Sequence, residues 1–178
     1  MPLLQSFPAL TGRAPRALIL GSMPGAASLA AGQYYAHLQN RFWPLMGTLI
    51  DAGPDLAYER RCRRLVGSGI ALWDVLASCE REGSLDSAIR DDTVQANDFG
   101  ALFARHPTIA MVLFNGSKAE NSFRRLVFPH LVATGAITAA LEFRRLPSTS
   151  PANASQSAGY KLAAWREALQ AGGIRTLC

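Results

Sequence analysis

Residues 17–25 read ALILGSMPG, so four apolar residues run directly into a turn that holds two glycines and a proline. A short apolar run that stops at such a turn is typical of a buried strand in a parallel sheet. Similar runs recur along the chain, each followed by Asp, Asn or Pro. Strands are therefore expected at residues 17–20, 70–73, 109–114 and 141–146.

Amphipathic stretches separate these runs, as helices do around a mostly parallel sheet. The clearest is the last, in which apolar residues recur at helical spacing from Ala158 to Leu169 and Gly172 ends the helix. We expect its N-terminal cap at Asn153 or Ser155. The other helices are expected at residues 42–50, 56–66, 99–105 and 119–128.

The length of the chain limits the number of domains. Its 178 residues, 49% of them hydrophobic, can bury one sizeable core but not two. We therefore expect an α/β fold in a single domain, residues 1–178. It should have three layers (α/β/α) around a central four-stranded, mostly parallel sheet.

Charge and cysteine usage narrow the function classes. The chain carries 18 Lys and Arg against 13 Asp and Glu, a net charge of +5. Most of the cations are arginines, whose guanidinium groups pair with phosphates in bidentate geometry, so a polyanion partner is favoured. Cys62, Cys79 and Cys178 lack the spacing of metal ligands or of a disulfide framework. We expect a cytoplasmic protein with no metal, no cofactor and no membrane or leader segment.

Ligands of open α/β sheets bind outside the carboxyl ends of the strands, where the loops converge. Three of the four expected strand ends carry unusual polar or Gly/Pro-rich segments, at residues 21–25, 115–117 and 147–153. We expect these three segments to share one rim of the sheet.

Each of these segments also has an ordinary interpretation. The glycines of residues 21–25 let backbone N–H groups approach a ligand, or they simply form a strand-to-helix turn. Asn115 either makes a turn with Gly116 or reads the edge of a ligand. The hydroxyls of residues 148–150, which lie between two prolines, suit phosphate contact or form a plain solvated loop.

Residues 33–43, QYYAHLQNRFW, gather four aromatic side chains, a histidine and an asparagine. Aromatic faces can stack on a base flipped out of DNA, and a carboxamide can bond to the edge of that base. The alternative is that Phe42 and Trp43 begin a buried helix face that Asn40 caps.

Taken together and in this order, the segments resemble the uracil-DNA glycosylase superfamily, and most closely its hypoxanthine-DNA glycosylase family. The resemblance spans nearly the whole chain. Residues 21–25 are similar to the first superfamily motif and residues 39–43 to the Asn-x-Phe-Trp segment. Residues 114–116 are similar to the base-reading strand end, and residues 146–151 to the DNA-intercalating second motif.

The resemblance implies an enzyme that flips a deaminated base out of DNA and hydrolyses its N-glycosidic bond in base-excision repair. Hypoxanthine is the preferred base, and uracil is a close second. Met23 stands where the superfamily usually places Asp or Asn to position the attacking water. In the hypoxanthine-cleaving family that duty falls to the position of Asn40, which is the expected catalytic residue. The resemblance also implies that Phe42 stacks on the base and that Asn115 bonds to its edge.

The other implied contacts divide between the base and the DNA backbone. The base pocket is expected to include Gly21, Ser22, Met23, Pro24 and Gly25. The expected DNA-binding loop consists of Pro147, Ser148, Thr149, Ser150 and Pro151. Some relatives carry an iron–sulfur cluster on four cysteines, and three scattered ones argue against a cluster here. We expect a monomer.

Several alternatives stay open. The chain could be a mismatch-type uracil-DNA glycosylase, or a DNA-binding relative without catalysis, for which Met23 is the best support. Asp74 could act as a carboxylate base or could merely cap a helix after Trp73. His37 and Tyr35 either contact the base or have structural roles.

Overall fold

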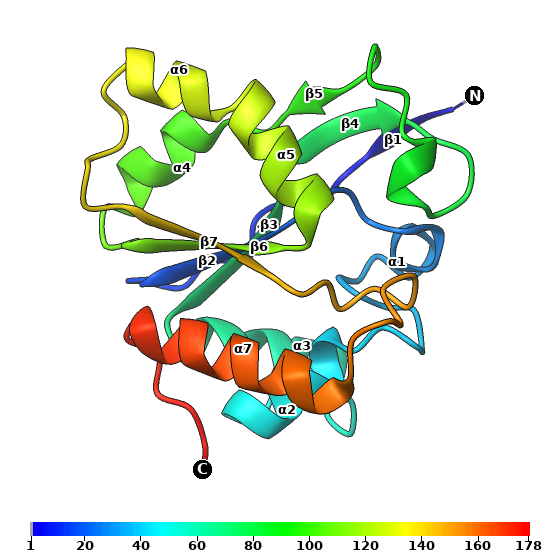
Figure 1. Cartoon of the computed structure of the whole chain (residues 1–178), viewed down its shortest axis with the longest axis vertical. Helices are drawn as coiled ribbons and strands as arrows, with labels where there is room; N and C mark the ends of the chain where they lie inside the picture. Colours follow the sequence, from blue (N-terminus) through cyan, green and yellow to red (C-terminus); the bar gives the residue numbers. More distant parts are fainter. Residues whose placement is uncertain (1) are drawn as a thin grey trace.

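The computed structural model describes residues 2–178, and its centre is a four-stranded sheet (Figure 1). The strand order is β3-β2-β6-β7, and each neighbouring pair is parallel. The predicted parallel sheet is therefore confirmed, with strand ends shifted by no more than two residues. The strands are β2 (Ala17–Gly21), β3 (Ile70–Asp74), β6 (Met111–Asn115) and β7 (Glu142–Leu146).

Helices cover both faces of this sheet, which confirms the expected three-layer architecture (Figure 1). One layer holds α2 (Phe42–Ile50), α3 (Tyr58–Gly67) and α7 (Ala158–Ala171). The other layer holds α4 (Phe99–Arg105), α5 (Ser117–Leu126) and α6 (Phe128–Ala133). A short helix, α1 (Ala26–Ala31), follows the turn after β2. Within residues 2–178, no helix has both the length and the apolarity needed to cross a membrane.

Two helix predictions need correction. The helix expected at residues 119–128 is α5, which ends at Leu126, and Phe128 already belongs to α6, because Pro129 fits the first turn of a new helix and cannot continue an old one. The cap of α7 is Ser157, whose side chain accepts a hydrogen bond from the Tyr160 N–H, rather than Asn153 or Ser155.

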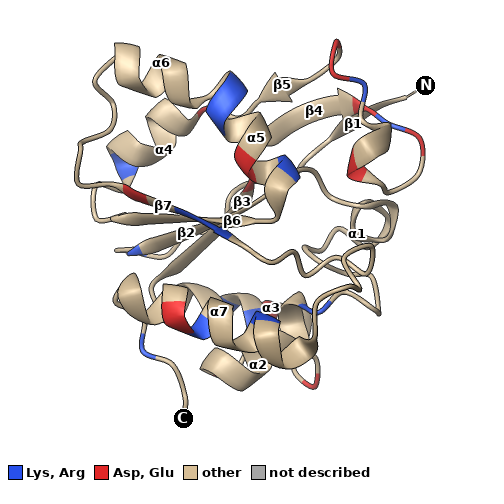
Figure 2. Ribbon diagram, viewed as in Figure 1, with Lys and Arg blue, Asp and Glu red and all other residues tan. Residues whose placement is uncertain are grey.

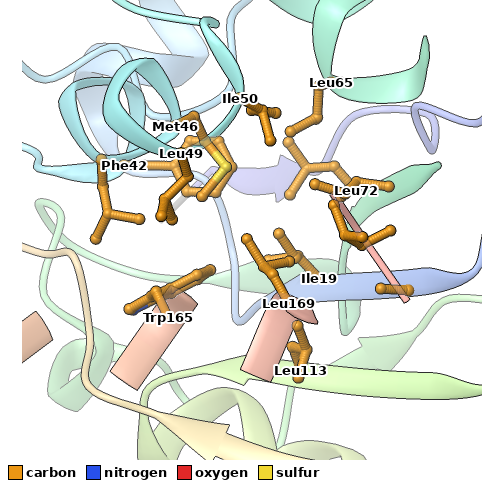
Figure 3. Packing of buried hydrophobic residues seen from close by; sticks show 14 of the residues in the cluster. Ile19, Phe42, Met46, Leu49, Ile50, Leu65, Leu72, Leu113, Trp165 and Leu169 are labelled. Atoms are coloured by element: carbon orange, nitrogen blue, oxygen red, sulfur yellow. The ribbon is translucent and has the colours of Figure 1, made fainter. Parts of the chain in front are cut away.

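The core follows from the alternation of side chains along the strands. In β2, Ala17 and Ile19 face the α2–α3–α7 layer, whereas Leu18 and Leu20 face the α4–α5–α6 layer. Figure 3 shows the first of these cores, in which side chains of all three helices close over Ile19 and Leu113. The apolar run of β2 is thus buried on both faces, as a central parallel strand requires.

A second, antiparallel sheet lies beside the first and was not anticipated. It has the order β1-β4-β5, with β1 (Leu3–Gln5), β4 (Leu76–Glu80) and β5 (Gln95–Ala96). Between β4 and β5, a short 3₁₀ turn, η1 (Asp86–Ala88), reaches back to the turn after β2. The segment that contains η1 forms one wall of a cavity at the end of the central sheet.

Candidate active site

The three segments predicted to share one rim do so. They line a cavity of about 1030 Å³ at the carboxyl ends of the central strands. Residues 21–25, 115–118 and 147–153 each contribute to its wall. Further lining residues are Tyr35, His37 and Asn40 from the loop before α2, Asp74 from the end of β3, and Asp86 from η1.

The turn after β2 presents its backbone to the cavity. A Cβ at Gly21 would collide with Asp74 Oδ1 and would lie 3.0 Å from the Tyr35 hydroxyl oxygen, so only glycine fits there. The Ser22 hydroxyl donates a 2.6 Å hydrogen bond to the Asp86 carboxylate. The Met23 side chain is buried in the core under α4 and α5. Of the base-pocket residues expected here, Ser22 and Met23 therefore offer main-chain groups rather than free side chains.

Asn40 lies just before α2, whose N-cap is Arg41 without a side-chain cap, so the interpretation of Asn40 as the cap is wrong. Its Oδ1 accepts a 2.9 Å hydrogen bond from the Phe42 N–H, which fixes the turn that leads into α2. Its side chain also lines the cavity and is only half-buried. Within residues 2–178, no acceptor bonds to its Nδ2, so one end of the carboxamide is fixed and the other is free to act.

Phe42 does not reach the cavity, contrary to the expectation that it stacks on a base there. Its ring is fully buried, and Tyr35 covers one face at a centroid distance of 4.1 Å. Phe42 opens α2 and shares a helical face with Met46 and Leu49, both in the core, and this spacing could have assigned it to the interior. The aromatic residue that stacks on Phe42 and lines the cavity is Tyr35, which is held in a left-handed backbone conformation with φ 53°.

Asn115 is held at both ends of its carboxamide by one residue of the opposite loop. Its Oδ1 accepts from the Thr149 N–H, and its Nδ2 donates to the Thr149 hydroxyl, each at 2.9 Å. Gly116 follows with φ 97°, so the turn interpretation of Asn-Gly also holds. One N–H and one oxygen lone pair of Asn115 remain for a ligand.

The loop at residues 147–153 is partly interior. Thr149 is fully buried and its hydroxyl is bonded to Asn115, so it cannot contact a phosphate. The expectation that Thr149 binds DNA is therefore wrong. The Pro147 carbonyl accepts a 3.0 Å hydrogen bond from Trp165 Nε1, which fixes the start of the loop. Ser148 and Ser150 are half-buried and Pro151 is exposed, so these three remain available to DNA.

Basic side chains lie on the rim of the cavity, and nearby carboxylates partly neutralise them. Lys118 and Arg145 line the cavity, and each has a carboxylate nearby, Asp91 at 3.3 Å and Glu120 at 3.5 Å. Strand β7 carries Arg144 and Arg145, and Figure 2 shows this basic stretch with acidic positions on the neighbouring helices. The rim is therefore mixed in charge rather than a continuous basic stripe.

Asp74 is the buried acid of the site. It ends β3 and is followed at once by β4, so the interpretation of Asp74 as a helix cap is wrong. Its side chain is 3% exposed and lines the cavity. Burial and the neighbouring Asp86 carboxylate raise the pKa of Asp74 to about 7, although Arg81 acts in the opposite direction.

Nothing in the described part of the chain resembles a metal site. Across residues 2–178, no group of three or more His, Cys, Asp or Glu side chains is placed to hold an ion. Among the groups that line the cavity, the buried acid Asp74, the carboxamides of Asn40 and Asn115, the phenol of Tyr35 and the main-chain groups of residues 21–25 lie at the strand ends and the loop before α2.

Comparisons with known proteins agree with this arrangement. Residues 8–171 match the Uracil DNA glycosylase superfamily. The hypoxanthine DNA glycosylase of Methanosarcina barkeri is 41% identical over 118 residues, which are 65% of this chain and 72% of that protein. The hypoxanthine DNA glycosylase of Methanosarcina acetivorans is 38% identical over 150 residues, which are 84% of this chain and 87% of that protein.

The fold is shared as well. A solution NMR structure of a candidate uracil DNA glycosylase from Methanosarcina acetivorans is similar with a TM-score of 0.71 and 35% identity, covering 93% of this chain and 98% of the other. The chain therefore belongs to the uracil DNA glycosylase superfamily and is a DNA glycosylase.

Proposed function

We propose that this glycosylase removes deaminated bases from DNA in base-excision repair, with hypoxanthine as the preferred base and uracil as a second substrate. The observation that carries the proposal is the convergence of Asn40, Asn115 and the backbone of residues 21–25 on one cavity. The two relatives named as hypoxanthine DNA glycosylases support the choice of base. We further propose that it acts as a monomer in the cytoplasm.

In this proposal, the protein orients water and stabilises the departing base. Cleavage of the N-glycosidic bond builds positive charge on the sugar and negative charge on the base. Asn40 holds the attacking water near C1′, since a carboxamide orients water but is not a base at neutral pH. Asn115 reads the carbonyl-bearing edge of the base, because hypoxanthine and uracil both carry a carbonyl where their parent bases carry an amine.

Tyr35 provides the aromatic face on which the flipped base stacks in this proposal. Its ring stacks on Phe42, and its hydroxyl is buried. Burial and the neighbouring Asp74 raise the pKa of the Tyr35 phenol, so the ring stays neutral. Stacking of a base on an aromatic side chain contributes about 1–3 kcal/mol.

We expect Tyr35→Leu to weaken capture of the flipped base by roughly 10-fold or more, from the loss of stacking. Tyr35→Phe is the matched control, because it keeps the ring on Phe42 and removes only the hydroxyl. The measurement is single-turnover cleavage of an inosine duplex as a function of enzyme concentration. If Tyr35→Leu and Tyr35→Phe lost cleavage activity equally, the Tyr35 ring would not be the surface on which the base stacks.

The substrate is tested by single-turnover cleavage of duplexes that carry one inosine or one uracil, with alkaline work-up to break the abasic strand. We expect abasic product from both duplexes, formed faster from inosine. Product from uracil alone would reassign the enzyme to the mismatch-type uracil glycosylases. Salt-sensitive binding to both duplexes without product from either would overturn the proposed activity.

A further inference from the structure

We propose that Asp74 is the general acid of the reaction, which delivers a proton to N7 of the departing purine. This inference rests on the proposed function, because it concerns hypoxanthine as the leaving base. It goes beyond the orienting roles of Asn40 and Asn115, neither of which can release a proton near neutral pH.

The position of Asp74 follows from the strand order. Asp74 is the register partner of Gly21 across the β2–β3 pair, and Asn115 ends β6 on the other side of β2. Neighbouring strands are about 4.8 Å apart, so the two side chains flank Gly21 from opposite sides. Asp74 Oδ1 and the Tyr35 hydroxyl lie closest to Gly21, so a base would lie beyond them in the cavity, between Asn115 and Asp74. In hypoxanthine, the edge that bears N7 would then face Asp74.

The Asp74 carboxyl group has no structural partner. Its Oδ2 is buried and unbonded, and its Oδ1 lies against the Cα of Gly21. The nearby Arg81 directs its hydrogen bonds to main-chain oxygens of Gly83 and Pro24, not to Asp74. Only the main-chain carbonyl of Asp74 is used by the fold, as the acceptor of a 2.8 Å bond from Asn97 Nδ2. An orphaned buried carboxyl of this kind needs a functional explanation.

The surroundings of Asp74 keep a proton on it. Burial disfavours the charged form, and the Asp86 carboxylate on η1 repels a second negative charge. Tyr34 and Tyr35, from the loop before α2, face it as neutral phenols. Arg81 at the end of β4 is the one cation that acts on it and only partly offsets these effects. With a pKa raised to about 7, Asp74 is both protonated in part at neutral pH and able to give the proton up.

The proposed step balances as a hydrolysis. The C1′–N9 bond breaks, and its electron pair goes to the purine. The Asp74 proton moves to N7, so hypoxanthine leaves as a neutral molecule and Asp74 becomes a carboxylate. Water adds to C1′ and loses a proton to solvent, and Asp74 is reprotonated from solvent. Uracil has no N7, so its departure gains nothing from this acid.

The test compares Asp74→Asn with wild type on two duplexes, one with inosine and one with 7-deaza-2′-deoxyinosine, in which carbon replaces N7. We expect Asp74→Asn to slow single-turnover cleavage of inosine by about 10²-fold or more, since general acids contribute that much. Wild type should cleave the 7-deaza duplex slowly, and Asp74→Asn should slow that reaction no further. The wild-type rate on inosine should fall as pH rises above about 7, because the protonated form is the active one. The variant should lose this dependence.

Two controls separate catalysis from folding. Asp98→Asn changes an acid that caps α4 away from the cavity and should leave cleavage unchanged. Because the raised pKa of Asp74 makes its ionisation unfavourable in the folded state, Asp74→Asn should melt no lower than wild type at pH 8. Lower melting together with lost activity would make Asp74 a structural residue and overturn the proposal.

Three kinetic outcomes also count against the proposed role of Asp74. Equal cleavage of inosine by wild type and Asp74→Asn would overturn the role of Asp74 and leave the proposed function intact. Equal slowing of the inosine and 7-deaza reactions by Asp74→Asn would show that N7 is not the proton acceptor. Failure of wild type to cleave inosine at all would overturn both the proposed function and this inference.

Discussion

Asn40→Ala is expected to slow cleavage of an inosine duplex by about 10²-fold or more while leaving affinity for that duplex nearly unchanged. The loss follows from geometry, since misplacing a reacting group by about 1 Å can cost that much. Asn40 is anchored by the Phe42 N–H, so its free Nδ2 occupies a fixed place on the cavity wall. Alanine removes both the anchor and the free amide. The measurements are single-turnover cleavage and duplex binding at one salt concentration.

Asn40→Ser is the matched control for the start of α2. A serine hydroxyl can still accept the hydrogen bond from the Phe42 N–H, but it is too short to replace the free amide. We expect Asn40→Ser to melt close to wild type and to lose as much activity as Asn40→Ala. Full activity in Asn40→Ser would show that Asn40 only stabilises the turn before α2, and the catalytic assignment would then be wrong.

Trp165→Ala is expected to lower the free energy of unfolding by about 3–5 kcal/mol, the usual range for a large aromatic side chain removed from a core. Trp165 is fully buried on α7 and packs edge-on against Phe42 at 6.2 Å between ring centroids. Its Nε1 also donates the hydrogen bond that fixes the Pro147 carbonyl. The variant therefore loses core packing and the anchor of the 147–153 loop together. Equilibrium denaturation in urea measures the first effect.

Trp165→Phe separates these two roles. It keeps most of the apolar volume but leaves the Pro147 carbonyl without its donor, which should cost about 1–3 kcal/mol. We expect this variant to fold and to cleave inosine more slowly than wild type, because the loop also holds Thr149 against Asn115. Cleavage at the wild-type rate by a destabilised Trp165→Phe would show that the loop needs no such anchor.

Local patterns were sufficient for much of the fold. The run at residues 17–20 is buried on both faces as a central parallel strand, so its composition already specifies its place. Helix α2 begins and ends at the predicted residues because its apolar spacing and the Gly53-Pro54 stop act within one segment. The three Gly/Pro-rich or polar strand ends were also predicted to meet, since parallel strands bring their carboxyl ends to one edge.

Pairing between distant segments escaped prediction. Strand β4 follows β3 with only Val75 between them, so no turn residue marks where one sheet gives way to the other. Strand β5 has two residues and acquires its conformation only by pairing with β4. Strand β1, near the N-terminus, also pairs with β4, although the two strands lie far apart in the sequence. Such strands carry little local signal because their stability comes from the partner.

The sequence by itself determined the parallel sheet, its helical layers, the shared rim and the place of Asn40 at the start of α2, because each depends on local spacing and on the geometry of parallel strands. Only the tertiary structure decided which side chains face the cavity. Packing turned Phe42 inward beneath Tyr35, tied Thr149 to Asn115, and buried Asp74 beside Asp86 without a hydrogen-bond partner. These outcomes depend on neighbours brought together from distant parts of the chain, and the protonation of a buried acid depends on those neighbours more than on its own identity.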